Sequence, residues 1–358
     1  MPKDQAAIER RIFESWRARA CAAGLCVGAQ IFLFGTGIVM PMALNSTWLC
    51  AVISLPFPVF ITIASRKKSI MYDSPVSCAA LIMLTITLLA NAVFASAALI
   101  SFAEQTLLEQ ARVLWIALLT VIAIFLCALS GGSGVSWLCF ALRWSLPVLI
   151  GGLILSSVPM KVPSGLFPLL GPGSASLGVG ALCMLGASSP ALMLLLPPPE
   201  LEQKKAEESL ASVPKIGFFV RRVLAGAAAG VLILLCACIC TTYEAIEESM
   251  EWGMRLRIVA SDQPHEGIPQ VLLILLQMTA ILLLCANMLS AAEQAFIYVM
   301  KKTGRSYIGL MLLSLLMILL LWLVTAYGFD LVLFAAPFLF VPALLILAMC
   351  RKKGATPR

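Results

Sequence analysis

The sequence predicts an all-α membrane protein with about ten transmembrane helices, and three observations support this fold class. Hydrophobic residues make up 61% of the 358 residues and charged residues only 12%, which is far too apolar for a soluble globular domain. The apolar residues gather in stretches of roughly 20, the length that crosses a bilayer. Most Lys and Arg residues lie between these stretches or near their ends, and they fall mainly on one side of the membrane.

Ten apolar stretches follow one another along the chain. Five precede residue 159 and five follow residue 173. This count permits a five-plus-five inverted repeat, because two repeats with an odd number of helices face opposite ways. The ten predicted spans, numbered here 1 to 10, are 21–44, 48–64, 76–101, 113–130, 137–158, 174–198, 216–241, 268–299, 306–326 and 331–350.

The predicted organisation places one repeat on each side of an outer connection. Its parts are a cytoplasmic segment 1–20, a first repeat 21–158, an outer connection 159–173, a second repeat 174–350 with an outer loop 243–267, and a cytoplasmic tail 351–358.

The distribution of Lys and Arg tests the number of spans independently. With the N-terminus in the cytoplasm, 21 of the 25 Lys and Arg residues fall on the cytoplasmic side. A wrong number of spans would scramble this alternation, so the positive-inside rule supports ten spans with both termini in the cytoplasm. The net charge of +7 then reflects membrane topology. It does not indicate nucleic-acid binding, because no basic patch with interleaved aromatic residues occurs.

Span 1 contains a glycine pair, Gly35-Thr36-Gly37, followed by Ile38 and then by Pro41. Two glycines and a nearby proline favour an opening of the helical hydrogen-bond ladder. Opened backbone persists in a bilayer only where protein or a water-filled cavity covers it, and in transporters the solute sits at such places. The alternative is a glycine surface for helix packing, since glycine is common in membrane helices.

Span 6, the expected partner of span 1 in an inverted repeat, is also interrupted. It carries the run Gly186-Ala187-Ser188-Ser189-Pro190. Interruptions by Gly and Pro at matching places of two halves indicate a transporter binding site. The alternative is a simple proline kink relieved by the neighbouring serines.

These motifs resemble those of the B subunits of spore germination receptors, which are amino acid permease-like members of the amino acid–polyamine–organocation superfamily. The resemblance runs nearly end to end. It rests on Phe34-Gly35-Thr36-Gly37-Ile38 in span 1, on Leu166-Phe167-Pro168-Leu169-Leu170-Gly171-Pro172-Gly173 before span 6, on the ten spans, and on the long outer loop before span 8.

The resemblance implies the inverted-repeat fold of the leucine-transporter type and a site for an amino acid or similar nutrient between spans 1, 3, 6 and 8. It also implies a germinant-sensing role in the spore inner membrane or cell membrane, with two further receptor subunits, a larger membrane protein and a lipoprotein. An ion-coupled amino acid permease is the alternative function. Two departures from the family pattern occur: Ser188-Ser189-Pro190 replaces an aromatic–Gly–Glu motif, and Phe140 stands where an Arg is common.

Eight residues are predicted to bind the ligand. Backbone amides near Gly37 and Ile38 would receive a carboxylate, because helix N-termini carry partial positive charge. Serine hydroxyls of span 6 would receive the polar end, and Asn91 in span 3 would face the cavity or form an interhelical hydrogen bond. The predicted ligand-binding residues are Gly35, Thr36, Gly37, Ile38, Asn91, Gly186, Ser188 and Ser189.

Four residues are predicted to bind an ion or to gate the inner mouth. Asn287 and Ser290 in span 8 are three residues apart and share a helix face, which in the implied fold opposes span 1. Glu293 is an acid within a span and is therefore a functional candidate, unless it lies near the cytoplasmic surface or pairs with a base. Arg143 in span 5 would replace an ion or gate the inner mouth, unless it is an interfacial anchor beside Trp137 and Trp144.

The remaining features of the chain exclude several classes of function. The outer loop 243–267 reads as an amphipathic helix that acts as a lid, a docking surface or a solvated connector, and it holds the single histidine, His265. Neither a nucleophile–base constellation nor paired acids within a span occur, so we expect no enzymatic activity. The twelve cysteines are scattered, and the densest group, at 236, 238 and 240, cannot face one metal from a helix. We therefore expect no metal site and no cofactor.

Overall fold

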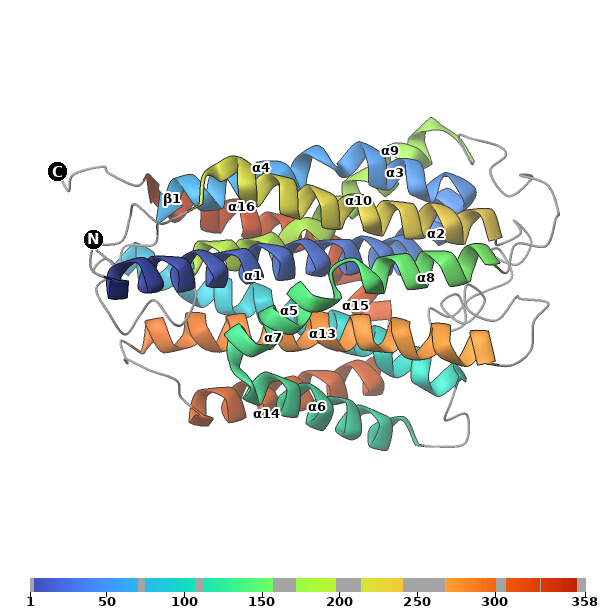
Figure 1. Cartoon of the computed structure of the whole chain (residues 1–358). Coiled ribbons are helices and arrows are strands. Elements are labelled where there is room, and N and C mark those ends of the chain that lie inside the picture. Colours follow the sequence, from blue (N-terminus) through green and yellow to red (C-terminus); the bar gives the residue numbers. More distant parts are fainter. Residues whose placement is uncertain are drawn as a thin grey trace.

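The computed structural model describes residues 3–69, 75–106, 112–156, 172–197, 214–240, 268–300, 307–328 and 330–352. Within these ranges each of the ten predicted spans is helical. The helices lie side by side with their axes roughly along one direction, as expected for a bundle that crosses a membrane (Figure 1). The outer loop 243–267 with His265, the connection 159–171 and most of the charged segment 200–215 lie outside the described residues.

The helices of the first repeat follow the predicted spans closely. Span 1 consists of α1 (Lys3–Phe34), a π-helical turn (Gly35–Val39) and α2 (Met40–Ala43), followed by a short 3-10 turn (Leu44–Ser46). Span 2 is α3 (Thr47–Ser54) and α4 (Pro56–Lys67), span 3 is α5 (Pro75–Thr106), span 4 is α6 (Val113–Leu129), and span 5 is α7 (Gly131–Leu142) and α8 (Ser145–Ser156).

The second repeat contains the other five predicted spans. Span 6 consists of α9 (Ser174–Met184) and a 3-10 helix, η4 (Leu185–Leu195). Spans 7, 8 and 9 are α10 (Ile216–Cys240), α13 (Ile268–Val299) and α14 (Tyr307–Tyr327). Span 10 is α15 (Asp330–Ala335), a 3-10 turn (Ala336–Leu339) and α16 (Phe340–Met349).

Length and composition alone identify fewer spans than ten in the described part of the chain. Six helical stretches are long and apolar enough to cross a membrane, and α6 with α7 makes a seventh if this pair, bent by 97°, is one span. The first of the six runs from Arg10 to Lys67 and contains predicted spans 1 and 2. The difference arises because spans 1 and 2 count as one continuous stretch, and because α8 and the helices of span 10 are too short to count.

The beginning of span 5 differs most from its prediction. The helix α7 starts at Gly131, six residues before the predicted boundary at 137, and follows α6 almost directly. Gly131 has a φ of +85°, a conformation that glycine adopts without steric cost. This single residue turns the chain, so no longer connection is needed between the two helices.

Apolar side chains also cover outward-facing surfaces of the bundle. On α14, Ile308 is 72% exposed and Trp322 51%, and on α6, Trp115 is 60% exposed. The two helices pack against each other along one edge of the bundle (Figure 1). Such surfaces are stable against lipid.

Helices α1 and α10 approach each other more closely than side chains would allow. Gly24 and Gly28 of α1 face Gly226 and Gly230 of α10. A Cβ atom built on Gly226 would lie 2.1 Å from the carbonyl oxygen of Gly24. Two small-residue pairs spaced by four residues let backbones touch in membranes, so this contact fixes span 1 against span 7.

A short strand pair joins two ends of the chain. β1 (Lys68–Ser69), after span 2, pairs antiparallel with β2 (Arg351–Lys352), after span 10, with Lys68 opposite Lys352. The start of α1 lies at the same end of the bundle (Figure 1). The basic segments after spans 2 and 10 therefore meet at one end of the bundle.

Candidate functional site

Span 1 departs from α-helical geometry at the predicted glycine pair. Residues Gly35–Val39 form a buried π-helical turn, a geometry that is rare and is found frequently at functional sites. The Thr36 hydroxyl donates a hydrogen bond to the carbonyl oxygen of Phe32 at 2.9 Å. The turn is widened, but it stays helical and is not fully unwound, because the missing side chains at Gly35 and Gly37 allow the backbone to rearrange without losing all its hydrogen bonds.

Span 6 changes geometry at the predicted Gly/Ser/Pro run. The helix α9 gives way at Leu185 to the 3-10 helix η4, which spans eleven residues and contains Pro190. Runs of 3-10 helix longer than three or four residues are uncommon. All residues from Gly186 to Leu195 are buried. The two broken segments therefore both lie inside the bundle, where protein covers the altered backbone.

Asn91 on span 3 connects the two broken spans. Its Oδ1 accepts hydrogen bonds from Gln30 Nε2 on α1 at 3.1 Å and from the Ser189 hydroxyl on η4 at 2.9 Å. Its Nδ2 donates to the carbonyl oxygen of Thr87 at 2.7 Å. Gln30, Asn91 and Ser189 are fully buried. We call Gln30, Asn91 and Ser189 the three-span junction.

Two atoms of the three-span junction have spare hydrogen-bonding capacity. Gln30 Oε1 is buried and has no hydrogen-bond partner in the described part of the chain. The Ser189 hydroxyl lies within reach of both Asn91 Oδ1 and the carbonyl oxygen of Gly186, at 2.9 and 2.7 Å, but it has one proton to donate. A ligand with a donor, such as an ammonium group, would satisfy the acceptors that remain.

Aromatic and backbone contacts close the space beside the junction. The centres of the Phe34 and Phe94 rings lie 4.8 Å apart, and this contact joins span 1 to span 3. A Cβ atom on Gly186 would lie 2.8 Å both from the Phe34 ring and from the carbonyl oxygen of Ala336 on span 10. Gly186 is therefore required for this close approach of spans 1, 6 and 10.

The far end of η4 is held by cationic and amide side chains from three other spans. Arg19 of α1 donates from Nε and Nη2 to the carbonyl oxygen of Met193 at 3.1 and 3.0 Å. Arg66 of α4 donates to the carbonyl oxygen of Leu194 at 3.4 Å. Gln294 of α13 donates to the carbonyl oxygen of Pro197 at 2.6 Å. Helix C-terminal carbonyls carry partial negative charge, which cations stabilise.

Arg66 is also held by aromatic rings. Its guanidinium carbon lies 4.1 Å from the centre of the Trp16 ring and 4.4 Å from that of Phe219. Such cation–π contacts stabilise a desolvated arginine. Neither Arg19 nor Arg66 was predicted as a site residue, because both belong to the basic residues near the span ends that were assigned to membrane topology.

The predicted ion-site residues of span 8 are buried on α13. Asn287 is 1% exposed, Ser290 4% and Glu293 4%. Asn287 donates to the sulfur of Cys139 on α7 at 3.1 Å and to the carbonyl oxygen of Leu283 at 2.8 Å. Ser290 lies beside Gly132, also on α7. The contacts with Cys139 and Gly132 join α13 to span 5, whereas Leu283 lies on α13 itself. Ion binding by this face stays a prediction.

Arg143 lies at the break between α7 and α8. Its guanidinium donates to the carbonyl oxygen of Phe140 and lies 3.9 Å from the centre of the Phe140 ring. The only ion pair among the described residues joins Arg10 and Glu14, on the surface of α1. The structure therefore does not bring Arg143 and Glu293 together as an ion pair, and a gating role for either residue stays a prediction.

Sequence reasoning identified two members of the three-span junction, Asn91 and Ser189, but missed Gln30. Gln30 lies five residues before Gly35 and is the polar residue with the largest hydrogen-bonding capacity in the apolar part of span 1. A buried amide in a membrane span is costly unless it is paired. That signal, read together with Asn91, could have pointed to the contact.

Comparison with known proteins identifies the fold but not a family. No protein-family profile and no curated protein sequence matches the chain. Among solved structures, MhsT in complex with L-phenylalanine is similar with a TM-score of 0.63 and 15% sequence identity, over 94% of this chain and 88% of that one. A mutant of the manganese transporter of Eremococcus coleocola is similar with a TM-score of 0.59 and 15% identity, over 93% and 76%.

The protein is therefore an integral, multi-pass membrane protein with the fold of the leucine-transporter type. The predicted fold class is confirmed. The structural relatives are membrane transporters rather than enzymes. At 15% identity the likeness concerns the fold alone.

Proposed function

We propose that this protein binds a small amino acid-like nutrient between spans 1, 3 and 6 and acts as the nutrient-sensing membrane subunit of a spore germination receptor. The observation that carries the binding proposal is the three-span junction. It brings Gln30, Asn91 and Ser189 together where both broken spans leave α-helical geometry. The sequence motifs shared with germination receptor B subunits support the sensing role.

In this proposal the polar atoms beside the broken helices hold the two ends of the ligand. The backbone amides near Gly37 and Ile38, with Thr36, receive the carboxylate once the π-helical turn opens, because in this structure that turn stays helical. Gln30 Oε1 and the hydroxyls of Ser188 and Ser189 receive the amino group. Gly186 leaves room for the Phe34 ring and the Ala336 carbonyl oxygen, and Gly35 leaves room for the Leu234 side chain of α10.

Signalling then requires that the protein has two conformations and that the ligand binds one of them with higher affinity than the other. A ligand that draws Gln30, Asn91 and Ser189 toward itself changes how spans 1, 3 and 6 pack. The two further receptor subunits, a larger membrane protein and a lipoprotein, would detect that change. The same arrangement would serve in the spore inner membrane or in the cell membrane.

The second candidate function is an ion-coupled amino acid permease. The fold shared with MhsT, which was solved with L-phenylalanine, favours it. In that case Asn287 and Ser290, whose Oδ1 and Oγ are buried without a hydrogen-bond partner among the described residues, together with Glu293 and Arg143, would take part in ion coupling or gating.

Binding and uptake by proteoliposomes separate the two functions. A panel of labelled amino acids is tested with proton and sodium gradients, for the wild type and for Gly37→Leu. A sensor binds a ligand without accumulating it, whereas a permease accumulates it along an ion gradient, and both activities are lost in Gly37→Leu. Binding that is unchanged in Gly37→Leu would contradict the proposed site.

A further inference from the structure

Three arginines gather around Cys21, toward the end of the bundle where α1 begins. Arg17 precedes Cys21 on α1, Arg143 stands at the break between α7 and α8, and Arg222 lies on α10. All three lie close enough to the Cys21 thiol to act on it electrostatically. The guanidinium carbons of Arg17 and Arg143 also lie 4.8 and 3.9 Å from the centre of one ring, that of Phe140. We call Arg17, Arg143 and Arg222 the arginine cluster.

Two members of the arginine cluster line a groove in the side of the bundle. The groove encloses about 30 Å³ between α1, α10 and the break in span 5, and its lining includes Arg143, Arg222 and Trp144. Trp144 is 57% exposed, so the groove opens on the outward-facing surface. At roughly 10–15 Å³ for each water-sized unit, it holds about two or three such units. None of the three junction residues lines it.

The guanidinium groups at the groove are open to a ligand. Arg222 makes no hydrogen bond or ion pair with the described residues, and none of its nitrogens is among the covered polar atoms, so all three are accessible. On Arg143 only Nε is covered, and Nη1 donates to the Phe140 carbonyl oxygen, which leaves Nη2 to donate outward. The only ion pair among the described residues joins Arg10 and Glu14. The groove therefore favours an anion.

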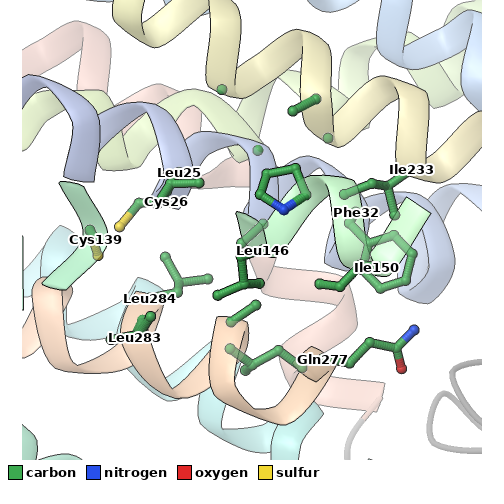
Figure 2. Close-up of a pocket in the computed structure, with 18 residues that line it drawn as sticks. Leu25, Cys26, Phe32, Cys139, Leu146, Ile150, Ile233, Gln277, Leu283 and Leu284 are labelled. Atoms are coloured by element: carbon green, nitrogen blue, oxygen red, sulfur yellow. The ribbon is translucent and has the colours of Figure 1, made fainter. Parts of the chain in front are cut away.

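Beyond the arginine cluster the groove meets apolar surface. Leu25, Gly226 and Ala229 line both the groove and an adjoining cavity of about 60 Å³, whose lining contains no charged side chain. Figure 2 shows Leu25, Leu146 and Ile150 at this cavity. On spans 1, 5 and 7 the arginine precedes these apolar residues, and the three spans run in the same direction in the predicted topology. Charge followed by apolar surface is the order of a lipid headgroup and its acyl chains.

We propose that the groove binds the phosphate headgroup of an anionic phospholipid from the adjacent leaflet. Two phosphate oxygens enter the groove and accept hydrogen bonds from Arg143 and Arg222, a pairing that suits the planar guanidinium. The rest of the lipid lies outside, with its acyl chains against Trp144 and the outward-facing surface. The distribution of Lys and Arg predicts that this end is cytoplasmic, and the cytoplasmic leaflet carries anionic lipids that basic pockets between spans bind.

Native mass spectrometry of the purified full-length protein in detergent tests this site, because it measures the binding of individual lipids. The probes are phosphatidylglycerol, which is anionic, and phosphatidylcholine with the same acyl chains, which has the same phosphodiester but no net charge. We expect phosphatidylglycerol to bind at least about fivefold more tightly, the factor that one arginine near the membrane surface contributes. Equal affinity of the two lipids for the wild type would overturn the proposal, whether or not any variant folds.

Two variants locate the binding. Arg222→Gln should lower the affinity for phosphatidylglycerol about fivefold. Arg221→Gln removes the same charge from the neighbouring exposed residue, which does not line the groove, and should bind like the wild type. Unchanged affinity in Arg222→Gln, or an equal loss in both variants, would overturn the site, since the second result indicates surface charge alone.

Inorganic phosphate separates a lipid from a free anion. It presents the same oxygens as the headgroup without acyl chains. We expect that inorganic phosphate in tenfold excess leaves the bound phosphatidylglycerol in place. Displacement of the lipid by inorganic phosphate would show that the groove binds free anions and would overturn the assignment to a phospholipid.

Discussion

At the scale of single residues, Gln30 carries the test between the proposed binding site and a purely structural contact. Its Nε2 donates to Asn91, while its Oε1 is buried without a partner among the described residues. A purely structural amide would be expected to use both groups, because unsatisfied polar atoms in a bilayer are costly. In the proposed site, this spare acceptor is the atom that would accept a hydrogen bond from the amino group of the ligand.

Gln30→Leu should weaken binding of the amino acid about five- to tenfold, because one hydrogen bond to the ligand is lost. Folding should change little, since the variant removes an unsatisfied oxygen together with one interhelical hydrogen bond of about 0.6 kcal/mol. Binding by purified protein and the thermal unfolding midpoint check both parts. A fall in the unfolding midpoint with unchanged affinity would assign Gln30 a structural role only.

Gly186 provides a residue-scale test of the packing around span 6. Gly186→Ala places a methyl group 2.8 Å from both the Phe34 ring and the Ala336 carbonyl oxygen. Overpacking of this kind costs about 1–3 kcal/mol, and we expect a lower unfolding midpoint together with weaker ligand binding. Gly178→Ala, on the preceding helix with no atom within 4 Å of the new methyl group, should leave both unchanged.

At the scale of helices, the contact of α1 with α10 depends on glycine. In Gly226→Ala the new Cβ would lie 2.1 Å from the Gly24 carbonyl oxygen, and backbone atoms cannot move aside as a flexible side chain can. The helices must separate, so we expect destabilisation of about 1–3 kcal/mol or more. Thermal unfolding in detergent measures it. Gly217→Ala on the same helix, with open space around the new methyl group, is the matched control and should be neutral.

The end of η4 is the second element-scale feature. Arg19 donates two hydrogen bonds to the Met193 carbonyl oxygen and so ties span 1 to span 6. Arg19→Gln should raise hydrogen exchange of the backbone amides in residues 191–196, because η4 loses this support. Arg10→Gln removes an exposed pair with Glu14 and should have no effect there. Equal exchange in the wild type and in Arg19→Gln would contradict this role.

At the scale of the whole molecule, the sequence predicted which parts of the chain form the spans. Membrane spans need long apolar stretches, and the alternation of Lys and Arg orders them, so each predicted span corresponds to a helix. The breaks in spans 1 and 6 were predictable because Gly35, Gly37, Gly186 and Pro190 weaken the helical ladder. Their form was not, since the choice between an unwound segment, a π turn and a 3-10 helix depends on the neighbouring spans.

The contacts across the bundle were less predictable than the helices. Asn91 and Ser189 stood out as polar residues in apolar spans, but nothing in the spacing showed that Asn91 accepts hydrogen bonds from both Gln30 and Ser189. Arg143 and Glu293 appeared complementary from charge alone, yet Arg143 folds onto Phe140 of its own span. Interhelical partners are fixed by rotation and depth of each helix, and sequence periodicity gives neither accurately.

The central claim is that Asn91 organises a binding site for an amino acid-like ligand between spans 1, 3 and 6. Its most direct test is equilibrium binding of labelled amino acids to the wild type, to Asn91→Leu and to Ser96→Ala. Ser96 is a buried residue of the same helix whose hydroxyl donates to the Ala92 carbonyl oxygen. We predict that Asn91→Leu lowers affinity at least tenfold and that Ser96→Ala binds like the wild type. Equal affinity of the wild type and Asn91→Leu would contradict the claim.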